Sequence, residues 1–469
     1  MRSLIWFRGK DLRVADHGPL VEAVAAGEVI PLFVLDPYFF TPERARALAP
    51  RMQVLLDALE DLEQAITRLG SRLVLVTGRS VDVVPRWAAR WKVDQVLAHR
   101  WSEPFGRDRD ERIGQALGSQ GIPFHLFEGE TLLPPGSLHS ASGNPFSVFT
   151  AFARAFQREG EVSLPLPRPG HLPPLPAEVV GEVLSLPKLQ DLGIVRNQSI
   201  QQGGETAGSK RLQEFLFSGL SSYRQDRDRM DREGTSRLSM DLHFGTLSVR
   251  TLWRRVSEQD ADDNARVFRN ELLWREFAHH WLWQRPELLS QPFRTPFQGF
   301  PWRDDEKLWQ AWTEGRTGYP VVDAAARQLL GEGFVHNRAR MVAASFLAKH
   351  LLLDFRRGEA HYLAHLADAD WANNDLGWQW SAGCGCDAQP WFRIFNPMLQ
   401  GERFDPDGDY VRRWVPELAS LPARWIHKPH LAPAGVLKAA GVETYPRPIV
   451  DHAEARNLFL QTAKAHLQR

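Results

Sequence analysis

The chain of 469 residues has little cysteine, no long apolar run and no excess of either charge. Its two cysteines, Cys384 and Cys386, are too few for a disulfide framework or for a four-thiolate metal or iron–sulfur site. No apolar run reaches the roughly 18 residues that a membrane-spanning helix needs. Lys and Arg total 57, as do Asp and Glu. Because no basic domain is evident, any binding of nucleic acid must depend on local positive patches.

These shortages also bear on where the protein acts. The apolar stretch near the N-terminus is too short for a signal peptide. Low cysteine content is typical of proteins that work in a reducing compartment. His279-His280 lacks the H-E-x-x-H pattern of a zinc site. We therefore expect a cytoplasmic protein without a metal site.

Tryptophan, by contrast, is abundant and unevenly placed. Of the 17 Trp, four lie in residues 1–252 and thirteen lie between Trp253 and Trp425. Large, flat side chains at this density indicate either an unusually aromatic core or a site for a flat, conjugated ligand.

Residues 1–130 alternate short apolar runs with helical patterns, which predicts an α/β domain with a doubly wound parallel sheet. The expected strands are Leu4–Phe7, Val29–Leu35, Arg72–Val76, Gln95–Ala98 and Pro123–Phe127. The expected helices are Gly18–Ala26, Glu43–Leu69, Val81–Arg90 and Arg107–Ser119. No G-x-G-x-x-G follows the first strand, so a standard dinucleotide fingerprint is missing.

The rest of the chain predicts a linker and a large all-α domain. Residues 131–203 form the expected interdomain linker, with seven Pro between Pro165 and Pro187. Residues 204–469 are helical nearly throughout. The expected helices are Lys210–Gly219, Val249–Val256, Asn264–Trp283, Asp304–Glu314, Val321–Gly331, Arg338–Leu353, Glu359–Ala367 and Ala453–His466.

Two segments of the helical half carry residues suited to binding. Gly234–Ser239 places small hydroxyls beside an arginine, which suits a phosphate group, although a helix cap with a surface ion pair explains it equally well. Glu271, Trp274 and Arg275 share one side of a helix. They suit a base held by stacking and edge hydrogen bonds. On this pattern alone, however, core packing with an intrahelical ion pair is favoured.

Two further segments stand out for their composition. Asn337 and Met341 lie one helical turn apart beside arginines, although an amphipathic helix start gives the same pattern. Asp368–Trp380 holds three Trp, three Asp and two Asn in thirteen residues. Such a segment suits a flat conjugated ligand, with a Trp-rich core helix as the alternative.

Ordered motifs along nearly the whole chain resemble those of the cryptochrome/photolyase family, closest to the microbial cyclobutane pyrimidine dimer photolyases. They are Trp6-Phe-Arg…Asp11-Leu-Arg, Ser142-Gly-Asn-Pro-Phe-Ser147, Thr235-Ser-Arg-Leu-Ser239, Asn270–Phe277, Thr317-Gly-Tyr-Pro-Val-Val-Asp323, Asn373–Trp380 and Phe392-Arg-Ile-Phe-Asn-Pro397. The resemblance implies a light-driven FAD enzyme that repairs UV-damaged DNA and works as a monomer. In this family excited FADH⁻ passes an electron to a pyrimidine dimer flipped out of the duplex, and the cyclobutane bonds split.

The resemblance also implies roles for individual residues. The residues implied around the FAD phosphates and the adjacent chain are Tyr223, Thr235, Ser236, Arg237, Leu238, Ser239 and Arg275. The residues implied beside the isoalloxazine are Arg340, Asp368, Asp370 and Asn374. For the dimer it implies Trp274 and Trp380 as flanking rings, Glu271 and Asn337 as hydrogen-bonding groups and Met341 as a packing residue. Expected phosphate contacts to DNA are Arg227, Arg338 and Arg393.

Several positions distinguish relatives within the family. Asn337 and Met341 stand where the resemblance would place His in animal-type (6-4) photolyases. Trp380 stands where single-strand-preferring cryptochromes usually have Tyr, and Asn374 where signalling cryptochromes usually have Asp or Cys. The resemblance therefore favours dimer repair. The alternatives are a cryptochrome-type blue-light photoreceptor without repair activity and a (6-4) photolyase.

Two features concern electrons and light collection. Trp378 and Trp302 match the inner and outer positions of the family's three-Trp electron relay, but the middle position is Phe355. Phenylalanine is far harder to oxidise than tryptophan, so Trp371 is the expected substitute. In the α/β domain, Asp36, Arg51 and Glu103 match residues around an antenna chromophore, with a deazaflavin or flavin expected rather than a folate.

Overall fold

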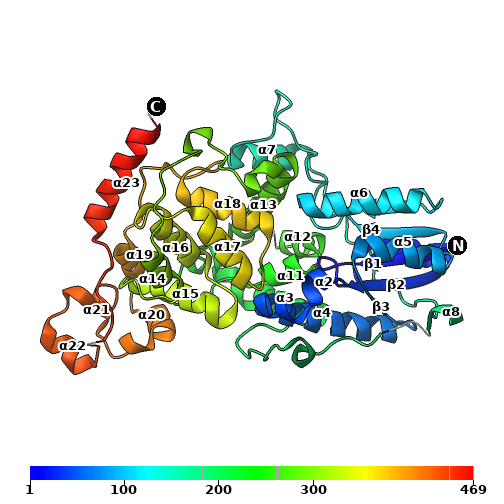
Figure 1. Ribbon diagram of the computed structural model, residues 1–469, viewed down its shortest axis with the longest axis horizontal. Coiled ribbons are helices and arrows are strands. Elements are labelled where there is room, and N and C mark those ends of the chain that lie inside the picture. The colour runs from blue at the N-terminus through cyan, green and yellow to red at the C-terminus, as the bar shows by residue number, and fades with distance from the viewer. Residues whose placement is uncertain (181–183, 260–262, 443, 468–469) are drawn as a thin grey trace. The chain divides into compact units, whose positions relative to one another are not determined.

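The computed structural model describes residues 1–180, 184–259, 263–442 and 444–467 (Figure 1). They form two compact units. The first contains Met1–Ser221, Ser236–Pro286 and Ala367–Ala372, and the second contains Ser222–Thr235, Glu287–Leu366 and Asn373–Arg469. The domain boundaries expected near residues 130 and 203 remain a prediction. None of the described helices is both long and apolar enough to span a lipid bilayer.

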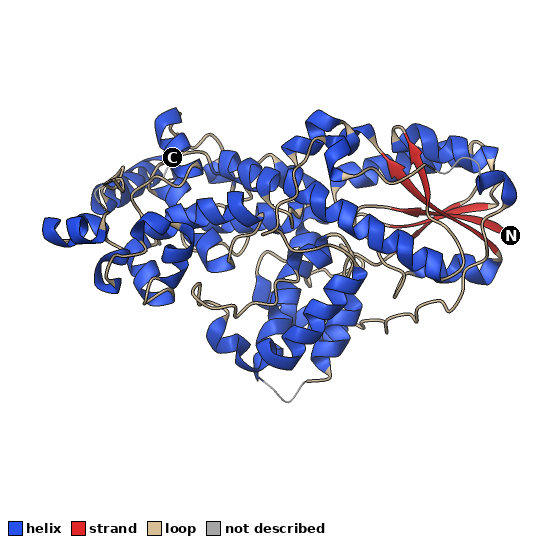
Figure 2. Cartoon of the chain, turned by 90° about the horizontal axis from the view of Figure 1, so that it is seen from below, coloured by secondary structure: helices blue, strands red, loops and turns tan. Residues whose placement is uncertain are grey.

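The first unit is built on a five-stranded parallel sheet, drawn red in Figure 2, in the order β3-β2-β1-β4-β5. The strands are β1 (Arg2–Phe7), β2 (Glu28–Leu35), β3 (Val74–Thr77), β4 (Gln95–His99) and β5 (Phe124–Phe127). The chain builds outward from β1 on one side and then crosses to the other, as in a doubly wound sheet. All five expected strands and this topology are confirmed.

Both faces of the sheet are covered, which is why the strands read as continuous apolar runs. Alternate residues of β1 enter different cores: Ile5 and Phe7 pack in one, and Leu4 and Trp6 in the other. The first core is completed by α1 (Gly18–Ala26) and α4 (Ala49–Arg68). The second core is completed by α5 (Ser80–Arg90) and α6 (Pro104–Gly118).

The single helix expected over Glu43–Leu69 was wrong in one respect, because the structure divides it. A short helix α3 (Pro42–Ala47) ends at Leu48, and α4 begins at Ala49. Pro50 explains the break, since proline has no backbone N–H to continue the hydrogen bonds of α3 and is tolerated only in the first turn of a helix. Asp36 caps another short helix, α2 (Pro37–Phe40).

The segment expected as a linker is only partly without regular structure. It contains α7 (Phe149–Glu159) and the single turn α8 (Ala177–Val180). The described helices of the first unit also include α9 (Glu205–Glu214), α11 (Ser239–His243), α12 (Val249–Ser257) and α13 (Asp263–Gln284). The helix expected at Lys210–Gly219 begins five residues earlier, at Glu205, and α9 is followed directly by a π-helical segment at Phe215–Gly219, so the expected end is confirmed.

The second unit is helical in its described part. Its helices are α10 (Tyr223–Asp226), α14 (Glu306–Thr313), α15 (Pro320–Glu332), α16 (Asn337–Lys349), α17 (Phe355–His365), α18 (Trp371–Ala382, of which the first two residues belong to the first unit), α19 (Pro397–Phe404), α20 (Asp409–Trp414), α21 (Ala423–Ile426), α22 (Ala434–Ala440) and α23 (His452–Leu467). The helical character expected for this part of the chain is confirmed.

A turn after β1 ties the sheet to the helices of the same unit. Arg13 donates to the carbonyl of Gly245 at 2.9 Å, and the amide of Leu12 donates to Phe244 at 3.1 Å. Asp16 forms a bidentate pair with Arg250 at 2.8 and 3.0 Å. The Asp11-Leu-Arg motif thus serves the packing of α11 and α12 against the sheet.

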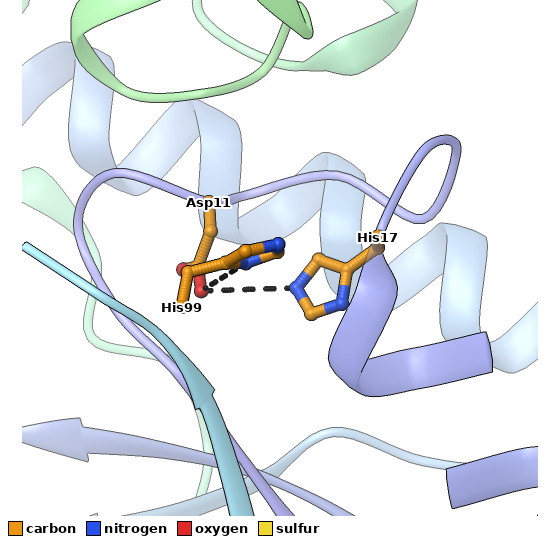
Figure 3. A group of neighbouring side chains, drawn as sticks. All are labelled: Asp11, His17 and His99. Atoms are coloured by element: carbon orange, nitrogen blue, oxygen red, sulfur yellow. Dashed lines mark hydrogen bonds and ion pairs between the residues drawn. The ribbon is translucent and has the colours of Figure 1, made fainter. Parts of the chain in front are cut away.

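Asp11 itself is the centre of a buried cluster with His17 and His99 (Figure 3). Its Oδ2 lies 3.1 Å from His99 Nδ1 and 3.7 Å from His17 Nε2. His17 Nδ1 accepts the Leu20 amide at 3.1 Å, so in the neutral ring Nε2 carries the proton and points it at Asp11. A ring in this state cannot offer Nε2 to a metal ion. The cluster is therefore built around one carboxylate, which is hydrogen-bonded to His99 and faced by the ring of His17.

Protonation of this cluster is coupled to folding. Burial would raise the pKa of Asp11, but the ring N–H groups of His17 and His99 outweigh it and hold that pKa well below its usual range. Burial lowers the pKa of His99 to about 3. The folded protein thus keeps His99 neutral at pH values where the unfolded chain protonates it.

We predict that His99 makes the fold acid-sensitive. His99 alone should lower the free energy of unfolding by about 2 kcal/mol between pH 7.5 and pH 5, because it takes up a proton near pH 6.5 in the unfolded chain and only near pH 3 in the folded chain. Denaturant unfolding at both pH values measures this. His99→Gln should reduce the difference, and the control His125→Gln, at an exposed position, should not. An unchanged difference in His99→Gln would contradict the account.

Candidate functional site

In the first unit, the expected base-binding residues lie on α13. Trp274 and Glu271 are partly exposed, as a ligand-binding role requires. The Trp274 ring stacks face to face on Phe149, with centroids 3.8 Å apart and planes 7° apart. Sequence reasoning missed Phe149, although Phe149, Phe152 and Phe156 recur at helical spacing.

Arg275, expected near the cofactor phosphates, is 8% exposed. It donates to the carbonyl of Glu130 at 2.8 Å and lies 3.7 Å from Glu276. Its charge is therefore largely balanced within the protein, and its side chain fixes α13 against the residues after β5.

The loop Ser236–Leu238 offers groups that fit a phosphate. Arg237 has a φ of +51°, a left-handed conformation that costs a residue other than glycine about 1 kcal/mol. Such strain is commonly retained at functional sites. Ser236 Oγ accepts the Leu238 amide at 3.4 Å, and Ser239 begins α11. Hydroxyl and amide donors on a strained turn are the donor set that phosphate oxygens require.

Three other residues expected at the cofactor or at DNA lie in the second unit: Tyr223, Arg227 and Thr235. Thr235 follows Gly234, where an added Cβ would overlap Asp226, so this close approach requires glycine. Tyr223 is buried and begins α10. Arg227 lies with its guanidinium 5.7 Å from the Tyr223 ring.

A buried ionic network in the first unit surrounds Lys10. Its ammonium bonds Glu103, lies 2.5 Å from Glu130 and 3.7 Å from Asp370. Burial disfavours the charge on Lys10, but the three carboxylates outweigh it and raise the pKa of Lys10. His279 adds a contact from its Nε2 to Asp370 at 3.3 Å. The ammonium lies where carboxylates would otherwise attract a metal cation.

This network shows how two expected ligand residues are used. Asp370, expected beside the isoalloxazine, is held by Lys10 and His279. Burial would raise the pKa of Asp370, but its contacts with His279 and Lys10 outweigh the burial and hold that pKa well below its usual range. Glu103, expected near an antenna, is fully buried against Lys10. Burial raises the pKa of Glu103.

The other expected antenna residues also have internal contacts. Asp36 accepts the Tyr38 amide at 3.1 Å and the amide and hydroxyl of Ser80 at 2.9 and 2.8 Å. Burial lowers the pKa of Arg51 to about 10, while the nearby carboxylate of Asp368 opposes this shift. The carboxylate of Asp36 thus stabilises the ends of α2 and α5.

In the second unit, α16 carries the expected dimer contacts. Asn337 is exposed, and its Nδ2 lies 3.7 Å from Met341 Sδ, which confirms that the two side chains are one turn apart. Arg338 pairs with Asp228 at 2.9 Å and lies 4.3 Å above the Phe404 ring. Arg338 therefore has less charge to offer DNA than exposed Arg393.

The loop that carries Arg393 is held from inside. Lys349, at the end of α16 and fully buried, donates to the Arg393 carbonyl at 3.0 Å. Burial lowers the pKa of Lys349 to about 7. The same helix thus positions Asn337 at its start and the Arg393 loop at its end.

Asn374 lies on α18 among buried carboxyl groups. Its amide donates to the carbonyl of Glu359 at 3.1 Å. Burial raises the pKa of Asp375 to about 7 and that of Glu359 well above its usual range. Gln379 donates to Asp375 at 2.9 Å. These contacts fix the start of α18, which also carries Trp378 and the partly exposed Trp380.

Aromatic rings connect Trp378 to the surface by a path that sequence reasoning missed. The centroid of the Trp378 ring lies 6.0 Å from that of Trp312. The Trp312 centroid lies 5.6 Å from that of the partly exposed Trp309. Trp302 instead contacts Phe355, at 6.2 Å. In the first unit, Trp371 contacts Phe105 at 5.8 Å. Only the three-dimensional structure brings α14 and α18 together, so spacing alone gave no signal.

The whole chain has extensive similarity to known proteins. Family models described as "DNA photolyase" and "FAD binding domain of DNA photolyase" match residues 3–172 and 268–465. The chain is 41% identical to a deoxyribodipyrimidine photo-lyase of Agrobacterium fabrum, covering 97% of this chain and 96% of the relative. The chain belongs to the DNA photolyase family.

Solved structures of this family agree with the fold. A class III photolyase from Agrobacterium tumefaciens matches with a TM-score of 0.92 and 38% identity, over 100% of this chain and 98% of that one. A cryptochrome from Synechocystis matches with a TM-score of 0.87 and 29% identity, over 98% and 99% of the two chains. The photolyase fold expected from the resemblance, a parallel-sheet domain followed by a helical FAD-binding domain, is confirmed.

We predict that Trp378 depends on the absence of a side chain at Gly358. An added Cβ there would overlap the Trp378 ring and Leu347, so Gly358→Ala should destabilise the fold by roughly 1–3 kcal/mol. Gly377→Ala is the matched control, because its Cβ would meet nothing within 4 Å. It should be neutral or stabilising by about 0.5–1 kcal/mol. Denaturant unfolding measures both, and equal stabilities would contradict the packing argument.

Proposed function

We propose that this protein is a deoxyribodipyrimidine photo-lyase, a lyase that uses light to split cyclobutane pyrimidine dimers in UV-damaged DNA. The observation that carries the proposal is the agreement with relatives of that name over nearly the whole chain. The partly exposed Trp274, Trp380 and Met341 and the exposed Asn337 support it, because they offer flat, apolar and amide surfaces suited to a flipped pyrimidine pair.

FAD is the cofactor that the helical domain binds in this family. The hydroxyls and amides of Thr235–Ser239 fit its phosphates, and Asp368, Asp370 and Asn374 offer polar contacts for its ring. The chemistry supplied by bound, reduced FAD is transfer of one electron after absorption of light. The protein's part is to place the dimer, exclude water and fix charges around the ring.

For the substrate, Trp274 and Trp380 would flank the dimer while Glu271 and Asn337 hydrogen-bond its edges. Arg227 and Arg393 would contact backbone phosphates. Since the chain carries no net charge and few arginines are expected to contact phosphates, binding to undamaged DNA should be weak, with a modest salt dependence. Selectivity then depends on the flipped dimer rather than on attraction to the duplex.

A direct assay tests this function. The purified protein is reduced, mixed with UV-irradiated oligothymidylate and illuminated with blue light, and the recovery of absorbance near 260 nm is followed against a dark control. Recovery only in the light is expected. Bound FAD without recovery would overturn the proposal in favour of a photoreceptor, and absence of FAD would overturn both.

The substrate assignments predict distinct losses. Trp274→Ala should weaken binding of dimer-containing DNA about tenfold or more, since stacking on an aromatic ring contributes about 1–3 kcal/mol per base. Asn337→Ala should weaken it about two- to tenfold through a lost hydrogen bond. Both should retain FAD. Trp425→Ala, at a partly exposed Trp on α21, is the control and should bind as the wild type does.

We also propose that Trp309 and Trp312 supply electrons to Trp378 when the flavin is photoreduced. The Trp312 ring neighbours both Trp378 and Trp309, so the three rings form a continuous path. The path from Trp302 instead meets Phe355, which is hard to oxidise. Trp312→Phe should therefore slow photoreduction about tenfold or more. A tenfold change corresponds to about 1.4 kcal/mol in the activation free energy of electron transfer. Trp302→Phe and Trp371→Phe should slow it little. A larger loss in Trp371→Phe would favour the Trp371 route.

An antenna role for Asp36, Arg51 and Glu103 remains a prediction, with a deazaflavin or flavin as the expected chromophore. Asp36 and Glu103 are held by internal contacts, so we expect them to form fixed walls of such a site.

A further inference from the structure

Trp274 does not stand alone on α13. Phe149, the first residue of α7, covers one face of its indole at a centroid distance of 3.8 Å and an angle of 7°. Aromatic pairs in proteins generally prefer offset or edge-to-face arrangements. Nearly parallel rings at this spacing have instead the geometry of stacked bases.

The position of Phe149 is fixed by a row of buried rings. Phe152 and Phe156, one and two turns further along α7, are 1% and 2% exposed. Phe152 packs on Phe277 of α13 at 5.3 Å, and Phe156 packs on Trp253 of α12 at 5.5 Å. Phe149 is the partly exposed end of this row. These contacts fix α7, and with it the backbone of Phe149, against α12 and α13.

Phe277 completes the support for Trp274. Its ring meets the edges of both partners, at 6.0 Å and 70° from Phe149 and at 5.8 Å and 74° from Trp274. The indole is thus confined on one face by Phe149 and along one edge by Phe277. Ordering a large side chain on binding costs about 0.5–1.5 kcal/mol, and here that ordering precedes the ligand.

The chain that leads into α7 is also held. The Gly143 amide donates to the Ser140 carbonyl at 2.8 Å, and the Ser140 amide donates to Asn144 at 2.9 Å. Asn144 Nδ2 donates to Ser142 Oγ at 3.1 Å. Gly143 has a φ of +77°, which this turn requires. The motif Ser142–Ser147, which the substrate assignments leave without a role, thus leads through a closed turn to Phe149.

We propose that Phe149 is a positioning residue for recognition of the pyrimidine dimer. By covering one face of Trp274 it sets the plane of the indole, and the other face receives a pyrimidine ring, which gives a three-layer stack. The proposal rests on the proposed function, because it assigns the dimer to Trp274.

The test compares Phe149→Leu with Phe149→Tyr. Leucine keeps an apolar side chain but has no flat face, so we expect about three- to tenfold weaker binding of an oligonucleotide with one thymine dimer, the scale of one aromatic pair. Binding of the undamaged oligonucleotide, FAD absorbance and the repair yield at saturating substrate should stay at wild-type values. Tyrosine, which keeps the flat ring, should restore wild-type binding.

Phe156→Leu is the matched control on the same face of α7. It should lower stability, because Phe156 is buried, without changing the preference for damaged over undamaged DNA. If Phe149→Leu unfolds, the comparison of Phe149→Tyr with wild type still tests the ring requirement, and weaker binding by the tyrosine variant overturns the proposal.

Three other results would overturn the inference. They are wild-type dimer binding by Phe149→Leu, equal loss of damaged and undamaged DNA binding, and tighter dimer binding, which would make Phe149 a plug on the substrate's face. A wild-type protein that splits no dimers contradicts the proposed function itself. A repairing wild type with an indistinguishable leucine variant contradicts this inference alone.

Discussion

One buried ammonium group holds together distant parts of the first unit. Lys10, after β1, contacts Glu103, Glu130 and Asp370, which lie far apart in the sequence. Removing one partner of such a buried pair typically costs about 3–5 kcal/mol, because the remaining charge has no water to stabilise it. The contact fixes residues 367–372 against the sheet, and it orders the residues just before α18 rather than adding much net stability.

Aromatic side chains fix the positions of key tryptophans in both units. Phe149 and Phe277 confine Trp274 in the first unit, while Gly358 and Trp312 pack against Trp378 in the second. Packing and chemistry therefore use the same rings. The tryptophan-rich second half of the chain is consistent with this double use: some indoles fill the core, and we propose that others face the dimer or exchange electrons.

The sequence was sufficient for the sheet and most long helices, because buried strands and amphipathic helices leave periodic apolar patterns. It was insufficient where one residue overrides a pattern, as Pro50 does at the start of α4. Contacts between distant segments left no local signal, so the ring pairs Phe149–Trp274 and Trp312–Trp378 were missed. Most site residues came from family motifs, and the structure adds how Lys10, Asp228 and Lys349 hold several of them.

We propose that Trp274 of the first unit and Trp380, Asn337 and Met341 of the second unit select a cyclobutane dimer. The most direct test gives the reduced protein two otherwise identical oligonucleotides under blue light, one with a single cyclobutane thymine dimer and one with a single (6-4) photoproduct, and quantifies restored thymines by chromatography. We predict light-dependent repair of the cyclobutane dimer and none of the (6-4) product. Repair of the (6-4) product, or of neither lesion, would contradict this account.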